Sequence, residues 1–348
     1  MLPVLQATAA ALLFGLSAPL AKLLVGAVSP WLLAGLLYLG AGGFLTVMRL
    51  GRRGRPDLGT PLRASDRWWL AGVVLAGGIL APPLLLWGLA RAPAASIALL
   101  LNTEVIFTAL IAAAMFRENV GARILAATGL VALGGMAVEW SGSGPAISPA
   151  AAATLAACVL WGLDNNLTRR IAEADPLALV QVKGLAAGAT NLILAGLVGS
   201  PRPRLSAVAL GLGLGAVSYG ASLVLFVLAL RGLGAARAGA YFALAPFFGA
   251  AGAVLVLGEP LTPRLAVAGS LMAAAVWLLA REAHGHWHEH APGVHEHRHV
   301  HDAHHQHAHQ GWEGPEPHVH PHPTGPLAHA HPHRPDIHHA HDHGLDQP

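Results

Sequence analysis

The stretch Ala94 to Gly135, AASIALLLNTEVIFTALIAAAMFRENVGARILAATGLVALGG, returns in altered form at Ala235 to Val276, AARAGAYFALAPFFGAAGAVLVLGEPLTPRLAVAGSLMAAAV. A constant offset of 141 (259 − 118) places Glu118 on Glu259. Each copy reads as a long apolar segment, a short charged turn and a second apolar segment. A fixed offset in an apolar chain predicts a duplicated membrane protein. The alternative is two unrelated hairpins rich in Ala, Leu and Gly, since few aligned positions are identical.

Composition predicts a membrane protein with a polar tail. The 348-residue chain is 54% hydrophobic and 11% charged, with a mean hydropathy of +0.53, whereas a soluble domain carries about a quarter charged residues. Residues 1–283 are apolar, and residues 284–348 hold all 22 histidines. The single Cys158 excludes a disulfide within the chain. The sequence pI near 9.5 reflects arginines in short loops, so we expect a lipid bilayer and no nucleic acid as partner.

Ten stretches are long and apolar enough to form helices of roughly 20 residues, the length that spans a bilayer. They are residues 4–27, 30–48, 68–90, 93–116, 121–140, 150–168, 176–198, 206–230, 235–257 and 263–281. The first lacks the basic start of a signal peptide and its apolar run is too long for one, so we expect a retained helix. The predicted fold is an all-α membrane protein with ten transmembrane helices.

Arginines predict the orientation of these helices. With a cytoplasmic N-terminus, the cytoplasmic loops hold Arg49, Arg52, Arg53, Arg55, Arg63, Arg67, Arg117, Arg123, Arg169, Arg170, Arg231, Arg237 and Arg281. The outer loops hold only Arg91, Arg202, Arg204 and Arg264. Because basic loops stay in the cytoplasm, we expect both termini there.

Each half contains five predicted helices. Because five is an odd number, the second half must cross the membrane in the opposite direction to the first. Residues 1–140 then form one repeat, residues 141–281 a second, inverted repeat, and residues 282–348 a tail. Glu118 and Glu259 occupy equivalent turns, where we expect each to lie near the N-terminus of the next helix. Inverted repeats place a substrate site between them near the membrane midplane and allow alternating access.

Particular turns resemble a known family. The turn Gly-Glu-Pro-Leu-Thr at 258–262, its counterpart Phe-Arg-Glu-Asn-Val at 116–120 and the stretch Leu-Arg-Gly-Leu-Gly-Ala-Ala at 230–236 are similar to the EamA branch of the drug/metabolite transporter superfamily. The resemblance covers residues 1 to about 281. It implies a bundle of two inverted five-helix repeats in a bacterial-type inner membrane, moving small metabolites or drugs. One departure is Glu104-Val105, where the second half has Ala245-Pro246.

Glu104 is the foremost candidate for a coupling residue. It lies near the centre of its predicted helix, where a carboxylate must face a cavity or a partner. We interpret it as the proton- or cation-responsive group; the alternative is a structural carboxylate bound to a neighbouring helix. Asn102 is only two residues away and so lies on another face of the helix.

Further polar residues lie inside predicted helices. Lys183 lies roughly 10 Å into its helix at 1.5 Å per residue, a depth that allows an ion pair with Glu104. It would hold a substrate carboxylate or, alternatively, extend to the cytoplasmic face. Asp164 and Asn165 would line the inner mouth of a pathway or solvate a helix end. Asn191 and Tyr241 are candidate cavity linings.

The tail alternates histidine with other residues. The candidate metal ligands are His284, His286, His288, His290, His295, His297, His299, His301, His318, His320, His322, His329, His331, His333, His338, His339, His341 and His343. Alternate residues of an extended chain share a face, and imidazole suits zinc, nickel, cobalt and copper. Interspersed Pro and Gly predict a disordered tail. Its metal role is either physiological or incidental.

These observations favour a secondary transporter that exports a small metabolite or drug by proton-coupled alternating access and carries a metal-binding tail. No cofactor is required, and a homodimer is compatible with the sequence. A rival is a divalent transition-metal exporter fed by the tail, although residues 1–283 contain no histidine to select such an ion. A third hypothesis is a membrane-anchored metal sensor or store. No nucleophile elbow, phosphate-binding loop or metal triad supports an enzyme.

Overall fold

The computed structural model describes residues 2–51, 60–116, 122–141, 144–145, 147–172 and 174–280, and the tail segments 284–290, 293–299, 318–324 and 327–333. Contacts divide the chain into two compact units, Met1–Arg281 and Glu282–Pro348. The first unit is a helical bundle, and the second contains strands.

The first repeat consists mainly of helices, which are joined by short turns. Its elements are α1 (Leu2–Gly15), α2 (Ser17–Leu24), α3 (Pro30–Gly51), η1 (Ala64–Asp66), α4 (Arg67–Val73), the π-helix η2 (Val74–Leu80), α5 (Ala81–Leu89), α6 (Ala94–Leu100), α7 (Thr103–Phe116) and α8 (Ala122–Val138). Proline begins α3, because the first N–H groups of a helix need no partner within it.

The second repeat follows a short hairpin of β1 (Trp140–Ser141) and β2 (Gly144–Pro145). Its helices are α9 (Pro149–Arg169), α10 (Pro176–Leu197), α11 (Leu205–Gly215), the π-helix η3 (Ala216–Ala221), α12 (Ser222–Leu233), α13 (Ala235–Phe242), α14 (Ala245–Leu257) and α15 (Pro263–Ala280). The Ser148 hydroxyl accepts from the Ala151 N–H at 3.1 Å and caps α9. Gly258 ends α14 with a φ of 69°, a conformation that costs other residues more.

Each of the ten predicted segments coincides with helix in the described residues. Seven of these helical stretches are long and apolar enough to cross a membrane: Leu2–Leu24, Pro30–Gly51, Ala64–Leu89, Ala94–Phe116, Pro176–Leu197, Leu205–Leu233 and Arg237–Leu257. Ile124–Val138 and Pro263–Leu278 are apolar but shorter. The count of ten spans therefore stays a prediction, although a multi-pass helical bundle is clear.

Irregularities of the helices recur at nearly the same offset as the sequence repeat. The fourth span breaks between α6 and α7, and the ninth breaks between α13 and α14. The third span contains η2, and the eighth contains η3. Close packing also recurs, because a Cβ on Gly15 would lie 2.2 Å from the Ala245 carbonyl oxygen and one on Gly162 would lie 2.9 Å from the Thr108 nitrogen. The two halves thus share breaks, π-helices and packing.

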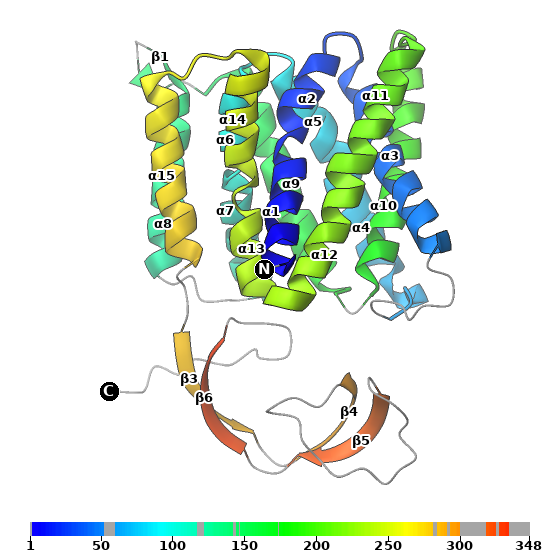
Figure 1. Ribbon diagram of the computed structural model, residues 1–348, viewed down its shortest axis with the longest axis vertical. Helices are drawn as coiled ribbons and strands as arrows, with labels where there is room; N and C mark the ends of the chain where they lie inside the picture. Colours follow the sequence, from blue (N-terminus) through cyan, green and yellow to red (C-terminus); the bar gives the residue numbers. More distant parts are fainter. Residues whose placement is uncertain are drawn as a thin grey trace. The chain divides into compact units, whose positions relative to one another are not determined.

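Helix ends gather at two faces of the bundle (Figure 1). One face, which we call the basic face, holds the ends that carry Arg49, Arg169, Arg170, Arg231 and Arg237. The α1 helix begins at the basic face and α9 begins at the opposite face, so the second repeat runs in the reverse direction. Helices α3 and α10 pack closely against each other.

The sides of the bundle carry exposed apolar side chains, including Leu205 and Leu255 with exposed fractions of 84% and 82%. Such side chains need an apolar solvent, which the hydrocarbon of a bilayer provides.

Composition predicts a disordered tail, whereas its described segments form strands. Strand β3 (His284–His290) pairs antiparallel with β6 (Leu327–His333), and β4 (Gly293–His299) pairs antiparallel with β5 (His318–Thr324). Alternation of histidine with other residues has the two-residue period of a strand, so this pattern permits strands where composition predicts none. His301, His338, His339, His341 and His343 lie outside the described residues.

Candidate substrate site

A buried ion pair lies inside the bundle. The Lys183 ammonium of α10 donates to the Asp164 carboxylate of α9, and the two side chains are 14% and 7% exposed. Lys183 therefore pairs with Asp164 and not with Glu104, the partner that its depth in the helix also allowed. Both α9 and α10 border η2, and this shared neighbour brings Asp164 and Lys183 together. Two charges so far from water are stable only when paired.

The π-helix η2 shapes the space beside this pair. A Cβ on Gly77 would lie 2.1 Å from Asp164 Oδ2, so the carboxylate occupies the place of a side chain. The Gly77 carbonyl accepts from the Tyr38 hydroxyl at 2.6 Å and from Trp161 Nε1 at 3.1 Å. A π-helix displaces carbonyls from the regular ladder and is frequent at functional sites. Here it directs a carbonyl towards two aromatic side chains.

Asn191 fixes the same π-helix from α10. Its Nδ2 donates to the Gly78 carbonyl at 2.9 Å, and the residue is fully buried. Within the described part of the chain, its Oδ1 has no hydrogen-bond partner. Asn191 therefore stabilises η2 and does not line an open cavity, contrary to its predicted role.

Glu104 lies in the first turn of α7, immediately after the break of the fourth span. Its Oε1 accepts from Asn165 Nδ2 at 2.9 Å, and the same amide lies 3.2 Å from Thr108 Oγ1. Asn165 is exposed and Glu104 is half-buried, so this pair borders open space. Glu104 also lies near enough to Asp164 and Lys183 to interact electrostatically. We call Glu104, Asp164, Asn165 and Lys183 the charged cluster.

Two other predicted residues lie elsewhere. Asn102 Nδ2 donates to the Leu99 carbonyl at 3.0 Å and lies 3.8 Å from Met272 Sδ of α15. Its side chain therefore faces the neighbouring helix, which the two-residue separation from Glu104 allows. Tyr241 packs against a small apolar cluster of α1, α12 and α13. Neither residue joins the charged cluster.

Aromatic side chains that the sequence analysis missed continue from the charged cluster. The Tyr38 and Tyr219 rings are 6.0 Å apart, and Phe14 lies 5.5 Å from Tyr219 and 5.3 Å from Phe242. These rings come from α3, η3, α1 and α13, so both repeats contribute. The only signal in the sequence was the presence of aromatic residues within otherwise aliphatic helices.

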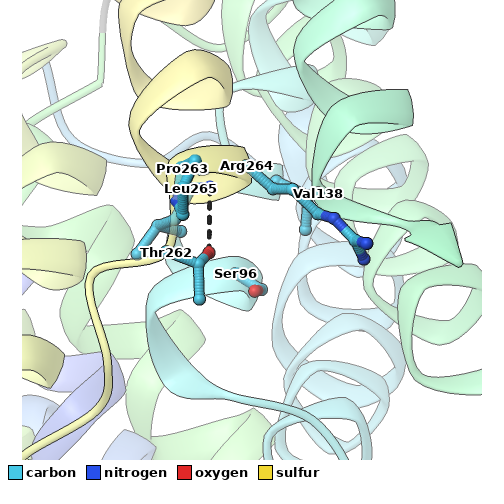
Figure 2. Close-up of a pocket in the computed structure, with 6 residues that line it drawn as sticks. All are labelled: Ser96, Val138, Thr262, Pro263, Arg264 and Leu265. Carbon is cyan, nitrogen blue, oxygen red and sulfur yellow. Dashed lines mark hydrogen bonds between the residues drawn. The ribbon is translucent and has the colours of Figure 1, made fainter. Parts of the chain in front are cut away.

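A separate hollow of about 450 Å³ lies at the face opposite the basic face. Ser96, Val138 and residues 262–265 line it, and the Leu265 N–H donates to the Thr262 hydroxyl at 3.2 Å (Figure 2). Ser96 belongs to α6, on the other side of the helix break from Glu104. The hollow is therefore distinct from the charged cluster.

The two units differ in the potential metal ligands that their described residues bring together. Among side chains placed by the structure, no three His, Cys, Asp or Glu residues gather into a metal site. In the tail, the strand register pairs histidine with histidine: His284 with His333, His286 with His331, His288 with His329, His295 with His322, His297 with His320 and His299 with His318.

Similarity to known proteins matches this architecture. The profile described as "EamA-like transporter family" matches residues 1–138 and 148–281. An "Uncharacterized transporter" of Methanothermobacter thermautotrophicus is 28% identical over 288 residues, which cover 78% of this chain and 83% of that protein. A solved structure described as "Crystal structure of protein" has a TM-score of 0.56 and 22% identity over 79% of this chain and 95% of that chain. The last likeness concerns the fold alone.

Proposed function

The chain belongs to the EamA-like transporter family, and on this premise we propose that it exports a small metabolite or drug across a bacterial-type inner membrane in exchange for protons. The basic face is then cytoplasmic, because basic loops are retained on that side. Both termini lie on the cytoplasmic side in this arrangement. The two repeats expose the site alternately to the two faces.

The position of Glu104 inside the bundle is the observation that carries the proposal. Glu104 follows the break of the fourth span, and broken helices of this kind form substrate and ion sites in secondary transporters. Its carboxylate lies inside the bundle with Asn165 as its hydrogen-bond donor at 2.9 Å. An ionisable group at this depth is costly and is typical of proton pathways. Glu104 therefore takes up a proton when substrate leaves and releases it when substrate binds.

The ion pair supplies groups of both signs for the substrate. A substrate carboxylate would replace Asp164 as the partner of Lys183. Asp164, then free of Lys183, would attract a substrate amine or a proton. The nearby Tyr38 and Trp161 would contact the apolar body of the substrate, because aromatic side chains combine apolar area with a polar group. Small molecules with both charged and apolar parts are thus the preferred candidates.

Proteoliposomes that contain pyranine, a pH-sensitive dye, would test proton exchange. Amino acids and cationic dyes would be added one at a time, and substrate-dependent proton movement would identify a transported compound. For that compound, Glu104→Gln is expected to abolish coupled proton movement. Glu139→Gln is the matched control, because Glu139 caps the Ser148 N–H at 3.0 Å on the opposite face. Unchanged, pH-dependent transport by Glu104→Gln would refute this mechanism.

We further propose that the tail binds zinc, nickel, cobalt or copper through cross-strand histidine pairs. Opposite residues in an antiparallel pair have Cβ atoms about 5 Å apart, and residues i and i+2 share a face. In the register of each two-strand ribbon, three histidines thus stand opposite three histidines. Pro321, Pro323 and Pro332 occupy the alternate register, where a missing N–H does not disturb the histidine pairs.

A variant of β6 would distinguish the effect of cross-strand histidine pairing on metal binding from the effect of the number of histidines. The changes Ala328→His, His329→Ala, Ala330→His and His331→Ala keep composition and spacing but move two histidines to the other face of the ribbon. Equilibrium dialysis of full-length protein against zinc or nickel should show fewer bound ions for this variant. Copper binding, followed by electron paramagnetic resonance, should show fewer nitrogen ligands per ion. Equal stoichiometry and equal ligation would mean that register plays no part.

A further inference from the structure

The turn between α5 and α6 is held by a lysine from the first span. Lys22 of α2 donates to the Leu89 carbonyl and, at 2.6 Å, to the Ala92 carbonyl. Carbonyls at the C-terminus of a helix lack partners within it and carry partial negative charge. The ammonium group satisfies both carbonyls and so ties the first span to the end of the third.

A glutamate from the second repeat holds the other side of the same turn. Glu259 Oε1 accepts from the Ala94 N–H at 2.7 Å, and Oε2 accepts from the Ala95 N–H at 2.8 Å. These are the first N–H groups of α6, which have no partner within the helix. Glu259 lies in the turn before α15, as expected, but its carboxylate binds the N-terminus of α6 and not that of α15. Thr262 caps α15, and Glu259 reaches across to the first repeat.

Lys22 and Glu259 act on one turn with opposite charges. They lie near enough to interact electrostatically. Each charge also has the sign that stabilises its helix end, positive at carbonyls and negative at N–H groups. We call Lys22, Glu259 and the turn 89–95 the latch. It joins the first, third and fourth spans to the turn between the ninth and tenth.

The helices beneath the latch are tightly packed. Six of the seven residues of α6 are buried, whereas Val105 and Leu110 of α7 are 46% and 42% exposed. A Cβ on Gly249 of α14 would lie 2.8 Å from the Gly15 carbonyl oxygen and 3.0 Å from Ala98 Cβ. The fourth span is thus tightly packed on the latch side of its break.

We propose that the latch closes the face opposite the basic face, and that the transporter must break it to open there. This inference rests on the alternating access of the proposed function. Each carboxylate bond in the latch is charge-assisted and therefore stronger than a neutral one. Opening would release Ala94 and Ala95 from Glu259 and would part the two repeats at this face.

Ser17 offers a reporter below the latch. It is buried in α2, five residues or about 7 Å along the helix from Lys22 at 1.5 Å per residue. It contacts Tyr219, one of the aromatic residues that border the charged cluster. A cysteine at this position, in a Cys158→Ala background without other cysteines, would react with a membrane-impermeant maleimide from the latch side only when that side opens.

The experiment compares labelling of Ser17→Cys in full-length protein in oriented proteoliposomes. Glu259→Gln and Lys22→Met are each expected to give about tenfold faster labelling, since weakening a charge-assisted bond shifts a two-state equilibrium by about that factor. Glu139→Gln, which removes a similar carboxylate cap from the same face, should leave the rate unchanged. Lys22→Met leaves the α6 N-terminus capped, so it remains informative if Glu259→Gln folds poorly.

Unchanged labelling in both latch variants would overturn the proposal. So would equal acceleration by Glu139→Gln, because that result would indicate general loosening of the face. The labelling rate requires neither proton coupling nor a known substrate. Failure of the latch is therefore distinguishable from failure of proton exchange through Glu104.

Discussion

Asp164 and Lys183 neutralise each other inside the bundle, and this dependence predicts a non-additive response to mutation. Removal of either partner leaves a buried charge uncompensated, which costs about 3–5 kcal/mol, whereas removal of both costs much less. Asp164→Asn and Lys183→Met should each lower stability by that amount, and the double variant should be more stable than either single variant. Denaturant unfolding in detergent would measure all three proteins. Simple additivity would show that the two charges are stabilised independently.

The sequence located most of the charged cluster but not its pairing. Depth along a helix follows from residue number at 1.5 Å per residue, so Glu104 and Lys183 could be placed at similar depth, whereas Asp164 was expected at the inner mouth of a pathway or at a helix end. Pairing depends on which helices are neighbours and on their rotation. The shared contact of α9 and α10 with η2, and the absence of a side chain at Gly77, decided that Lys183 binds Asp164. Neither fact is visible in the periodicity of a helix that is apolar all round.

At the scale of elements, Gly258 shows how a turn positions a functional side chain. Its φ of 69° ends α14 and directs the next residue, Glu259, towards α6. Gly258→Ala has space for its Cβ, so its cost arises from the left-handed backbone and should be about 1–2 kcal/mol. Gly239→Ala is the control, because this helical glycine also has open space but no positive φ. Thermal unfolding should separate the two; equal stability would exclude backbone strain at 258.

Other elements could not be predicted from the sequence. The π-helices η2 and η3 form hydrogen bonds that span one residue more than those of an α-helix, and no residue type marks them. The Gly77-Gly78 pair lies in η2, and η2 and η3 are separated by nearly the same offset as the sequence repeat. Neither observation could be connected with a π-helix before the structure was known. In the tail, composition predicted disorder, but strand pairing depends on contacts between residues about 20 to 50 apart in the sequence. The positions of the helices followed more directly from apolar segment length, although only seven stretches of the described residues are long and apolar enough to cross a membrane.

At the scale of the whole molecule, the proposed functions divide between the two units, transport in one and metal binding in the other. The charged cluster, the aromatic residues and the latch all lie in residues 1–281, whereas all histidines lie in residues 284–348. Glu104 and Asp164 supply oxygen ligands, which suit hard cations better than nickel or zinc. This donor set supports the proposal that protons and small organic molecules cross the membrane unit. Metal held by the tail would be stored or sensed and would not cross the bilayer.

A protein that ends at Arg281 tests this division. In proteoliposomes it should keep substrate-dependent proton movement at the level of the full-length chain, because the described bundle is complete without the tail. It should lose nearly all binding of nickel, cobalt and zinc, and neither protein should carry these ions along an imposed pH gradient. Glu104→Gln, introduced into the full-length protein and into the protein that ends at Arg281, gives the background level of proton movement. Metal flux that requires the tail would instead favour a transition-metal exporter, with the histidine ribbons delivering the ion to the charged cluster.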